Sequence, residues 1–391
     1  MMRQKRNEHE TFVDIIELQV SKTGQNVSGD VIFRERSAEA TTVILCDGLG
    51  SGIKANLAAN MAASRIGELL RLGLPVRRSC ERVVGTMHSA RTEDIPFAAF
   101  IIARIRHDGF ATILSYEMPM PLFVKDGFCY VRKPHYFPLG NEVVGEIGIM
   151  MKPSDALILV TDGVSQAGMG EGEYRMGWTM EGVCTYVNGL LRGGADIKDL
   201  SPAIFKNVRA ISGDTYGDDT SLVTLLCRNA ETLHILTGLP ENKMRDKDVI
   251  QSFASLGGKK VVCGSTTAEV VARVLDRKVE LFDVPKAYYE PPAYAIDGFD
   301  LVTEGAITLN QAYNILDADW GTCDLQSPVS DLCRLMKSAD RINFWVGDAV
   351  NKAHADIVFK QMNILPRLKI VERLADKLRN MEKLVTVEHV V

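Results

Sequence analysis

The stretch T-T-V-I-L-C-D-G-L-G-S, from Thr41 to Ser51, is the segment from which the fold of this chain is first predicted. Its residues Thr42–Cys46 are apolar or β-branched, which favours a strand buried on both faces. Asp47 stands at the end of that strand, and two glycines follow it. A carboxylate at a strand end, beside glycines that let a ligand approach the backbone, suits a cation or a phosphate. A strand closed by an ordinary Asp-Gly turn is the alternative.

The same arrangement of an acidic residue and a glycine recurs along the chain. Ala156–Gly163 reads A-L-I-L-V-T-D-G, Val27–Asp30 reads V-S-G-D, and Gly217–Thr220 reads G-D-D-T before another strand-like run. Carboxylates brought together at strand ends repel one another unless cations neutralise them. Because Mg²⁺ and Mn²⁺ prefer oxygen ligands, the recurring pattern predicts a divalent metal site and weakens the turn interpretation.

Composition excludes several classes of protein. The chain has 391 residues, of which 46% are hydrophobic and 24% charged, so a globular fold with a large core and two domains is expected. A net charge of −5 gives no electrostatic reason to expect nucleic acid or an anionic membrane as a partner. The longest apolar run, Phe97–Ala103, is too short for a membrane helix. The eight cysteines include no C-x-x-C pair, and the N-terminus lacks a signal sequence, which favours reduced thiols in a cytoplasmic protein.

Hairpin signals shape the expectation for residues 1–230. Asp108-Gly109 and Asp126-Gly127 each lie between two apolar runs, which is typical of tight hairpin turns. Two successive hairpins predict an antiparallel meander and argue against a parallel nucleotide-binding sheet in this part. Helical periodicity is expected over Gly52–Leu72, Ser79–Ala90, Thr179–Leu191 and Pro202–Ile211.

The pattern changes near Arg228–Glu231, where strands and helices begin to alternate. Alternation predicts a second α/β domain over residues 231–391, with a mostly parallel sheet and a regulatory role. Two segments of it are candidate contact regions for a ligand or partner, Cys263–Thr267 and Ala295–Gly305. Thr266 with Glu269 forms a T-x-x-E pattern, which predicts a capping box that would already occupy that helix N-terminus. Caps are also expected at Thr308 with Gln311 and at Ser327-Pro328.

The four acidic motifs, in this order and spacing, resemble the metal-dependent Ser/Thr protein phosphatases of the type 2C fold, and most of all their bacterial SpoIIE-type branch. The resemblance extends over roughly residues 10–228. It implies an α-β-β-α sandwich with antiparallel sheets and a centre of two divalent metal ions, Mn²⁺ or Mg²⁺.

The resemblance also implies roles for single residues. Asp47 would bridge both metals, with help from the Gly48 carbonyl, and Asp162 and Asp218 would hold one metal. Asp30 would lie close by and bind metal directly or through water.

Some assignments stay open at this point. The family register favours Asp218 over the adjacent Asp219 as the ligand, while Arg34 and Arg36 lie near the motifs without a clear match to the phosphate-binding arginine of eukaryotic relatives. In relatives of this branch, partners reposition the helices after the D-G-x-G motif. This makes Gly52–Leu72 a candidate switch, with an ordinary core helix as the equal alternative.

The function that follows is a Mn²⁺- or Mg²⁺-dependent protein serine/threonine phosphatase in bacterial regulation, in which metal-activated water attacks the phosphate. Its partners would be a phosphorylated protein and a regulatory ligand or protein on residues 231–391, with a homodimer left open. One alternative is a non-catalytic or partner-activated sensor or scaffold. A phosphatase with an aspartyl nucleophile is less favoured, because that class has a second aspartate two residues after the first, where this chain has Leu49.

Overall fold

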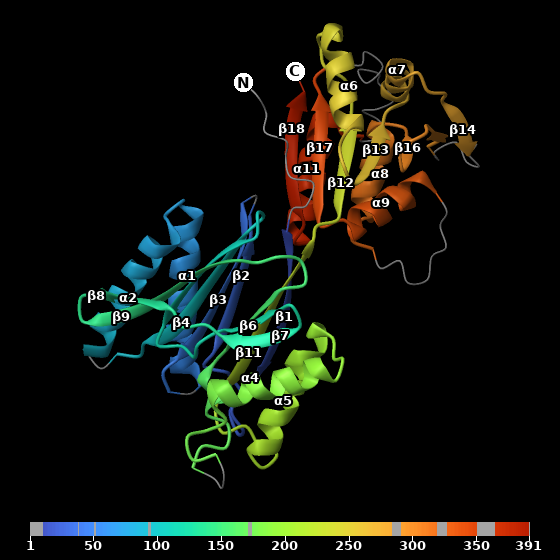
Figure 1. Cartoon of the computed structure of the whole chain (residues 1–391). Coiled ribbons are helices and arrows are strands. Elements are labelled where there is room, and N and C mark those ends of the chain that lie inside the picture. The colour runs from blue at the N-terminus through green and yellow to red at the C-terminus, as the bar shows by residue number, and fades with distance from the viewer. Residues whose placement is uncertain are drawn as a thin grey trace. The chain divides into compact units, whose positions relative to one another are not determined.

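The protein is described by a computed structural model, which covers residues 11–37, 39–50, 52–92, 95–170, 174–283, 291–318, 327–349 and 364–390. Two compact units are present, an N-terminal unit, His9–Asn229, and a C-terminal unit that comprises Ala230–Val391 (Figure 1).

The N-terminal unit contains two sheets in which every strand pairing is antiparallel. The six-stranded sheet has the order β2 (Val31–Arg36), β3 (Ala40–Gly48), β4 (Ala98–Arg106), β5 (Phe110–Tyr116), β9 (Glu142–Met150) and β8 (His135–Leu139). The five-stranded sheet has the order β1 (Thr11–Val20), β11 (Thr220–Asn229), β10 (Ala156–Val160), β6 (Leu122–Lys125) and β7 (Phe128–Val131).

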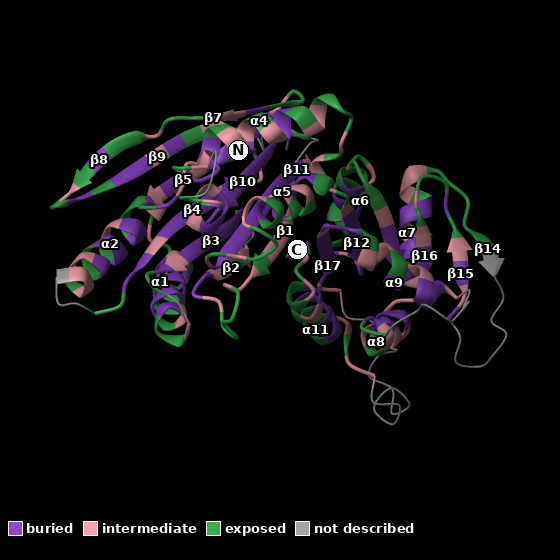
Figure 2. Ribbon diagram, turned by 90° about the horizontal axis from the view of Figure 1, so that it is seen from below, coloured by how far each residue is buried: buried purple, intermediate pink, exposed green. Residues whose placement is uncertain are grey.

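Helices cover the outer face of each sheet. The helices are α1 (Ile53–Arg71) and α2 (Val76–Thr92) on the six-stranded sheet, and α4 (Thr179–Arg192) and α5 (Ile197–Ile211) on the five-stranded sheet, with the short α3 (Asp162–Ser165) after β10. Leu45, Ile101 and Leu159 are among the buried residues that pack the two sheets together, and most strand positions in Figure 2 are buried. The predicted α-β-β-α sandwich with antiparallel sheets is confirmed.

Both predicted hairpins are present. Asp108-Gly109 connects β4 to β5, and Asp126-Gly127 connects β6 to β7. Asp126 and Gly127 both have positive φ, at 51° and 73°, as a tight hairpin turn requires. Strands β8 and β9 were not predicted. Helix α5 begins at Ile197, well before the expected start at Pro202, because the Asp196 carboxylate accepts a hydrogen bond from Lys198 N (3.0 Å) and caps it there.

The C-terminal unit is built on one seven-stranded sheet. Its order is β14 (Glu280–Asp283), β15 (Ala293–Ala295), β16 (Leu301–Thr303), β13 (Lys259–Cys263), β12 (Thr232–Thr237), β17 (Arg341–Gly347) and β18 (Leu384–Val390). The five strands from β16 to β18 in this order are parallel, and β14 and β15 add antiparallel pairings at one edge. The expectation of a mostly parallel sheet is confirmed.

Helices pack on both faces of this sheet. One face is covered by α6 (Asp246–Ala254), which follows the 3₁₀ turn η1 (Lys243–Arg245), and by α7 (Ser265–Leu275); the other is covered by α8 (Ala306–Ile315), α9 (Pro328–Ser338) and α11 (Arg367–Asn380). The chain runs outward from β12 to β16 on one side, then returns to β17 on the other. It is therefore a doubly wound α/β arrangement.

Two of the predicted caps in this unit are wrong. Helix α7 begins at Ser265 after Gly264, and α8 begins at Ala306 after Gly305; neither glycine position has a side-chain cap. Helix α7 starts earlier than expected because β13 ends at Cys263 and Gly264, at φ 129°, turns the chain at once; before α8, the strand β16 ends at Thr303, two residues before Gly305. The cap at Ser327 before Pro328 is as predicted, with Ser327 Oγ accepting from Ser330 N (3.2 Å).

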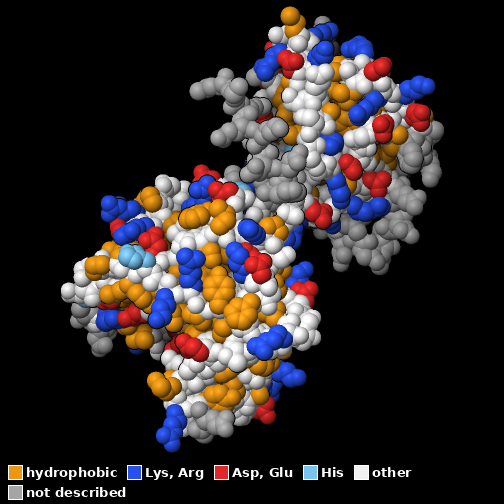
Figure 3. Space-filling model, in the orientation of Figure 1, with side chains coloured by type: hydrophobic (Ala, Val, Ile, Leu, Met, Phe, Trp, Pro, Cys, Tyr) orange, Lys and Arg blue, Asp and Glu red, His pale blue; other side chains and the backbone are white. Residues whose placement is uncertain are grey.

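Acidic and basic side chains are interspersed on the face shown in Figure 3, in line with the small net charge of −5. In the described part of the chain, no helix has the length and apolar character needed to cross a membrane.

Candidate active site

Hydrogen bonds bring the four acidic motifs to one end of the two sheets. Thr161 Oγ1 donates to Asp30 Oδ2 (2.9 Å), which joins the end of β10 to the start of β2. Gly29 N donates to Asp219 Oδ2 (2.8 Å), and Gly48 N donates to Gly29 O (3.3 Å). Segments that lie far apart in the sequence therefore meet at one place.

The pKa of Asp47 is affected by three other carboxylates of this cluster. Burial, and after it the nearby carboxylates of Asp30, Asp162 and Asp218, together raise the pKa of Asp47 to about 9. The Asp47 and Asp162 carboxyl groups are in hydrogen-bonding contact, and burial together with Asp218 raises the pKa of Asp162. A cluster of this kind cannot carry all its negative charge without a proton or a cation to compensate it.

Asp30 is the most deeply buried of the four, with only 2% of its surface exposed. Burial raises the pKa of Asp30 to about 7, although the hydroxyls of Ser221 and Thr161 act in the opposite direction. Its Oδ2 atom accepts from Thr161, whereas its buried Oδ1 atom has no hydrogen-bond partner in the described part of the chain. An unpartnered buried carboxylate oxygen suits a bound cation or an ordered water.

Asp218 and Asp219 have different partners. Asp219 is 4% exposed, and its two carboxylate oxygens accept from Lys22 N and Gly29 N, both at 2.8 Å. Asp218 is half-buried, its Oδ1 accepts from Asp219 N (2.9 Å), and its charge acts on Asp47 and Asp162. Asp219 therefore ties two backbone segments together, and its charge also raises the pKa of Asp30 and, with that of Asp218, the pKa of Asp162.

Glycine is required at two of the motifs because the backbone of another segment lies too close for a side chain. A positive φ is not the reason at these two positions. A Cβ atom at Gly48 would lie 2.0 Å from the Ala55 carbonyl oxygen at the start of α1. A Cβ atom at Gly163 would lie 2.2 Å from the Asp219 carbonyl oxygen. These glycines hold α1 and the start of β11 against the aspartates.

Three amide side chains support the site and were not predicted. Gln19 Nε2 donates to Asp30 O (3.1 Å), and Gln166 Nε2 donates to Asp162 Oδ2 (3.0 Å). Asn56 Nδ2 of α1 donates to Ser28 O (2.8 Å). Nothing in the sequence near Gln19 or Asn56 indicates these contacts, because their partners come from other segments. Thr161 was also missed, although it stands inside the T-D-G motif.

Neither arginine near the motifs is assigned to a phosphate. Arg34 Nη1 pairs with Glu17 (3.3 Å), and Arg36 lies over the Phe12 ring, 4.3 Å from its centroid. Arg36 is in register with Thr41, at the end of β3 opposite to Asp47.

The donor set is suited to a hard divalent cation, since it consists of clustered carboxylates and an unpartnered Asp30 oxygen. In the described residues, however, no three Asp, Glu, His or Cys side chains already converge closely enough to hold one metal ion. The aspartates are near enough to shift one another's pKa, and they would have to draw together further to share an ion.

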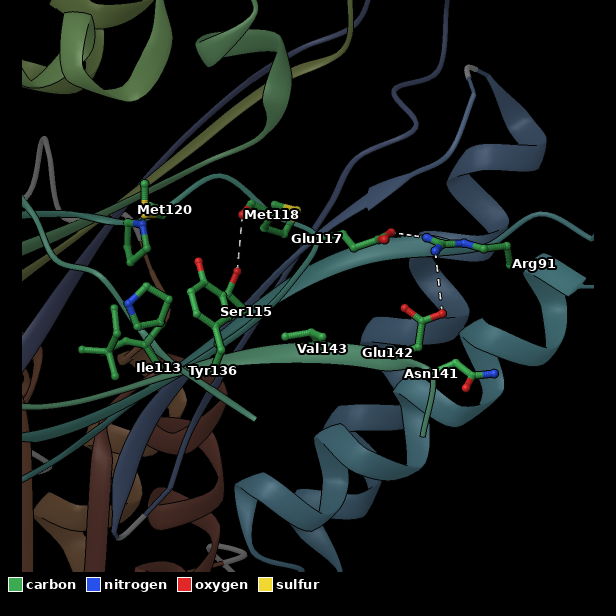
Figure 4. A pocket seen from close by; sticks show the side chains of 14 residues that line it. Arg91, Ile113, Ser115, Glu117, Met118, Met120, Tyr136, Asn141, Glu142 and Val143 are labelled. Carbon is green, nitrogen blue, oxygen red and sulfur yellow. Dashed lines mark hydrogen bonds and ion pairs between the residues drawn. The ribbon is translucent and has the colours of Figure 1, made fainter. Parts of the chain in front are cut away.

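A cavity of about 480 Å³ in the N-terminal unit lies elsewhere (Figure 4). Ser115 and Tyr136 line it, and Arg91 forms ion pairs there with Glu117 and Glu142. None of the motif aspartates lines this cavity, so it is not part of the acidic cluster.

Comparison with known proteins agrees with this architecture. Residues 37–228 match the family model "Stage II sporulation protein E (SpoIIE)". No curated protein matches the sequence.

Solved structures are similar at low sequence identity. The phosphatase domain of the cell fate determinant SpoIIE from Bacillus subtilis is 16% identical, with 56% of this chain and 94% of that chain covered and a TM-score of 0.44. The RsbU and RsbW domains of Rv1364c from Mycobacterium tuberculosis are 14% identical, with 68% and 70% covered and a TM-score of 0.46. RsbX in complex with magnesium is 17% identical, with 58% and 100% covered and a TM-score of 0.42.

Proposed function

Residues 37–228 of this chain form a SpoIIE-family domain, of the PPM phosphatase type, and we propose that it is a Mn²⁺- or Mg²⁺-dependent phosphatase of phosphoserine or phosphothreonine in proteins. The observation that carries the proposal is the partly buried cluster of aspartates around Asp47, in which burial and neighbouring carboxylates raise the pKa values of Asp30, Asp47 and Asp162. Such a cluster is unfavourable by itself and becomes favourable when divalent cations neutralise it.

In this proposal Asp47 would be a ligand of both cations, with help from the Gly48 carbonyl. Asp162 and Asp218 would hold one cation, and Asp30 would contribute its unpartnered oxygen directly or through water. Divalent ions there would supply a water of lowered pKa and would neutralise charge on the phosphate.

Other residues of the chain hold the proposed ligands in position. Thr161 and Gln166 orient two of the carboxylates by hydrogen bonds, and the glycine contacts at Gly48 and Gly163 keep α1 and β11 close to them. The proposed partners are a phosphorylated protein as substrate and a regulatory ligand or protein on the C-terminal unit.

A second candidate function is a resting or non-catalytic state that becomes competent only with a partner. The separation of the carboxylates supports it, since no three described acidic side chains already share one point. Helix α1 is the proposed switch, because its first turn packs against Gly48 while Ile53, Leu57 and Met61 stay exposed along its outer side.

A metal-titrated assay on p-nitrophenyl phosphate and on a phosphoserine peptide separates the two functions. The phosphatase proposal expects hydrolysis that needs added Mn²⁺ or Mg²⁺ and stops with EDTA, with the Asp47→Asn variant as the inactive control. Full activity in excess EDTA would contradict the hypothesis of a metal-dependent phosphatase. Metal binding without turnover would favour the partner-dependent state, and a phosphorylated Asp47 would favour an aspartyl nucleophile.

A further inference from the structure

The C-terminal unit has a crevice at the carboxyl ends of its parallel strands. The loops that follow β12, β13 and β16 line it, and its volume is about 480 Å³. The crevice lies where the sheet order changes direction, between β12 and β17. Doubly wound sheets bind their ligands at such a point, and the volume falls in the range of small-molecule sites.

Two helices begin at this crevice without a side-chain cap. Helix α7 starts after Gly264, and α8 starts after Gly305, and residues of both first turns line the crevice. The capping box expected at Thr266 and Glu269 is absent, and Gly264, the residue before α7, has no side chain to accept from the leading N–H groups. Uncapped helix N-termini suit an anionic group.

Among the described residues, three buried polar atoms around the crevice have no hydrogen-bond partner. They are Thr237 Oγ1, on a residue that is fully buried, Asp246 Oδ1, on a residue that is 9% exposed, and Arg367 Nε. All three residues line the crevice. Since a buried polar group without a partner is costly in free energy, these atoms point to a ligand with both acceptor and donor groups.

Arg367 is held in a defined position there. Its Nη2 atom donates to Ala349 O, and a Cβ atom at Gly238 would lie 2.2 Å from its Nη1. Only glycine at position 238 lets the guanidinium lie against the loop after β12. The guanidinium is thus placed for an acceptor such as a phosphate oxygen.

The charges around the crevice limit the class of ligand. Lys243, Arg273 and Arg367 are basic, while four acidic residues also line it, namely Glu241, Asp246, Glu269 and Glu304. A simple polyanion would be repelled by these carboxylates. A nucleoside phosphate combines a phosphate with hydroxyl and amino donors, which the carboxylates can accept.

We propose that this crevice binds a nucleoside phosphate, with the phosphate at the N-termini of α7 and α8 beside Arg367 and with a sugar hydroxyl or base amino group donating to Asp246. The ligand site lies within the C-terminal unit and does not depend on whether the acidic cluster of the N-terminal unit is catalytic.

Calorimetric titration of the full chain in EDTA tests this, because chelation keeps divalent ions away from the acidic cluster. The probes are AMP, ADP, ATP, GMP, adenosine, ribose 5-phosphate and inorganic phosphate. At least one nucleotide should bind at least tenfold more tightly than adenosine and than phosphate. No nucleotide binding at millimolar concentration would overturn the proposal. Equal binding of phosphate alone, or equal or tighter binding of ribose 5-phosphate, would overturn its nucleoside part.

Variants locate the site. Thr237→Val keeps the shape of the side chain and removes only the hydroxyl, so it should leave the melting temperature unchanged or higher and lower the nucleotide affinity by about tenfold. Asp246→Asn and Arg367→Met should lower the affinity at least as much. Arg334→Met on α9 is the matched control, because Arg334 forms an exposed ion pair with Asp331 and should leave the affinity unchanged. Unchanged affinity in all three crevice variants would overturn the site.

Discussion

Asp218 and Asp219 are neighbours in the chain, yet they are expected to respond differently to mutation. Asp218→Ala should abolish metal-dependent hydrolysis with little change in stability, because the loss of one acceptor, for Asp219 N, is offset by less repulsion among the half-buried acids. Asp219→Ala should only weaken hydrolysis and should lower the free energy of unfolding by about 1–3 kcal/mol, because Lys22 N and Gly29 N lose their acceptors. Peptide hydrolysis and thermal unfolding of both variants check this, and a reversed order of activities would identify Asp219 as the ligand.

Asp47→Asn should separate metal binding from folding. The substitution removes one buried charge from the cluster, so the metal-free protein should be at least as stable as the parent near pH 9, where Asp47 ionises. Turnover should be almost completely lost, and added Mg²⁺ should no longer raise the melting temperature as it does in the parent. A variant that keeps the full Mg²⁺-induced shift would show that Asp47 is not a ligand.

Protonation of Asp30 and Asp47 should make the stability of the metal-free protein depend on pH. Both pKa values are raised in the folded protein, from 3.8 to about 7 and about 9, so the folded state binds more protons than the unfolded state between these values. Their stabilising contribution is therefore complete below about pH 4 and is lost as the pH rises through 7 and then 9. Thermal unfolding in EDTA from pH 5 to 9 measures it, against a series with saturating Mg²⁺, in which the decline should be smaller.

Helix α1 is placed by a contact that tolerates no side chain at Gly48. Gly48→Ala should displace the helix, because its Cβ would lie 2.0 Å from Ala55 O, and should lower stability by about 1–3 kcal/mol together with activity. Gly85→Ala in α2 is the matched control, since Gly85 lies in open space inside a helix. That change should raise stability by about 0.5–1 kcal/mol. Denaturant unfolding measures the stability of both variants. An equal change in the free energy of unfolding would show that the contact between Gly48 and Ala55 does not require glycine.

At the scale of the whole molecule, we expect the N-terminal unit to carry the phosphatase activity and the C-terminal unit to regulate it. A fragment of residues 1–230 contains the unit His9–Asn229 with its own core and all four acidic motifs. Expressed alone, it should fold as a metal-dependent phosphatase whose rate or metal affinity differs from that of the full chain. An insoluble fragment would indicate one interdependent core, and a fragment that equals the full chain under every condition would leave the C-terminal unit without a regulatory role.

Local patterns in the sequence predicted the hairpins of the N-terminal unit and the mostly parallel sheet of the C-terminal unit, whereas β8 and β9 were missed. Asp-Gly between apolar runs is a local signal, and both predicted hairpins are present, since turn chemistry depends on two adjacent residues. Alternating strands and helices after residue 231 likewise indicated the mostly parallel sheet. The acidic motifs, taken together, indicated the SpoIIE family that the model match at residues 37–228 supports.

Only the tertiary structure decided what depends on segments that are distant in the chain. The family register favoured Asp218 over Asp219 as a ligand, but nothing in the sequence indicated that Lys22 N and Gly29 N donate to the Asp219 carboxylate. The T-x-x-E pattern at Thr266 is a valid cap in isolation, but the strand ends at Cys263, and the helix begins two residues earlier, after Gly264, without a side-chain cap. The sequence determines the local free energies of turns and caps, because these depend on neighbouring residues. Hydrogen-bond partners and burial depend on which distant segments the folded chain brings together, and so do the pKa values and the ligand sites that follow from them.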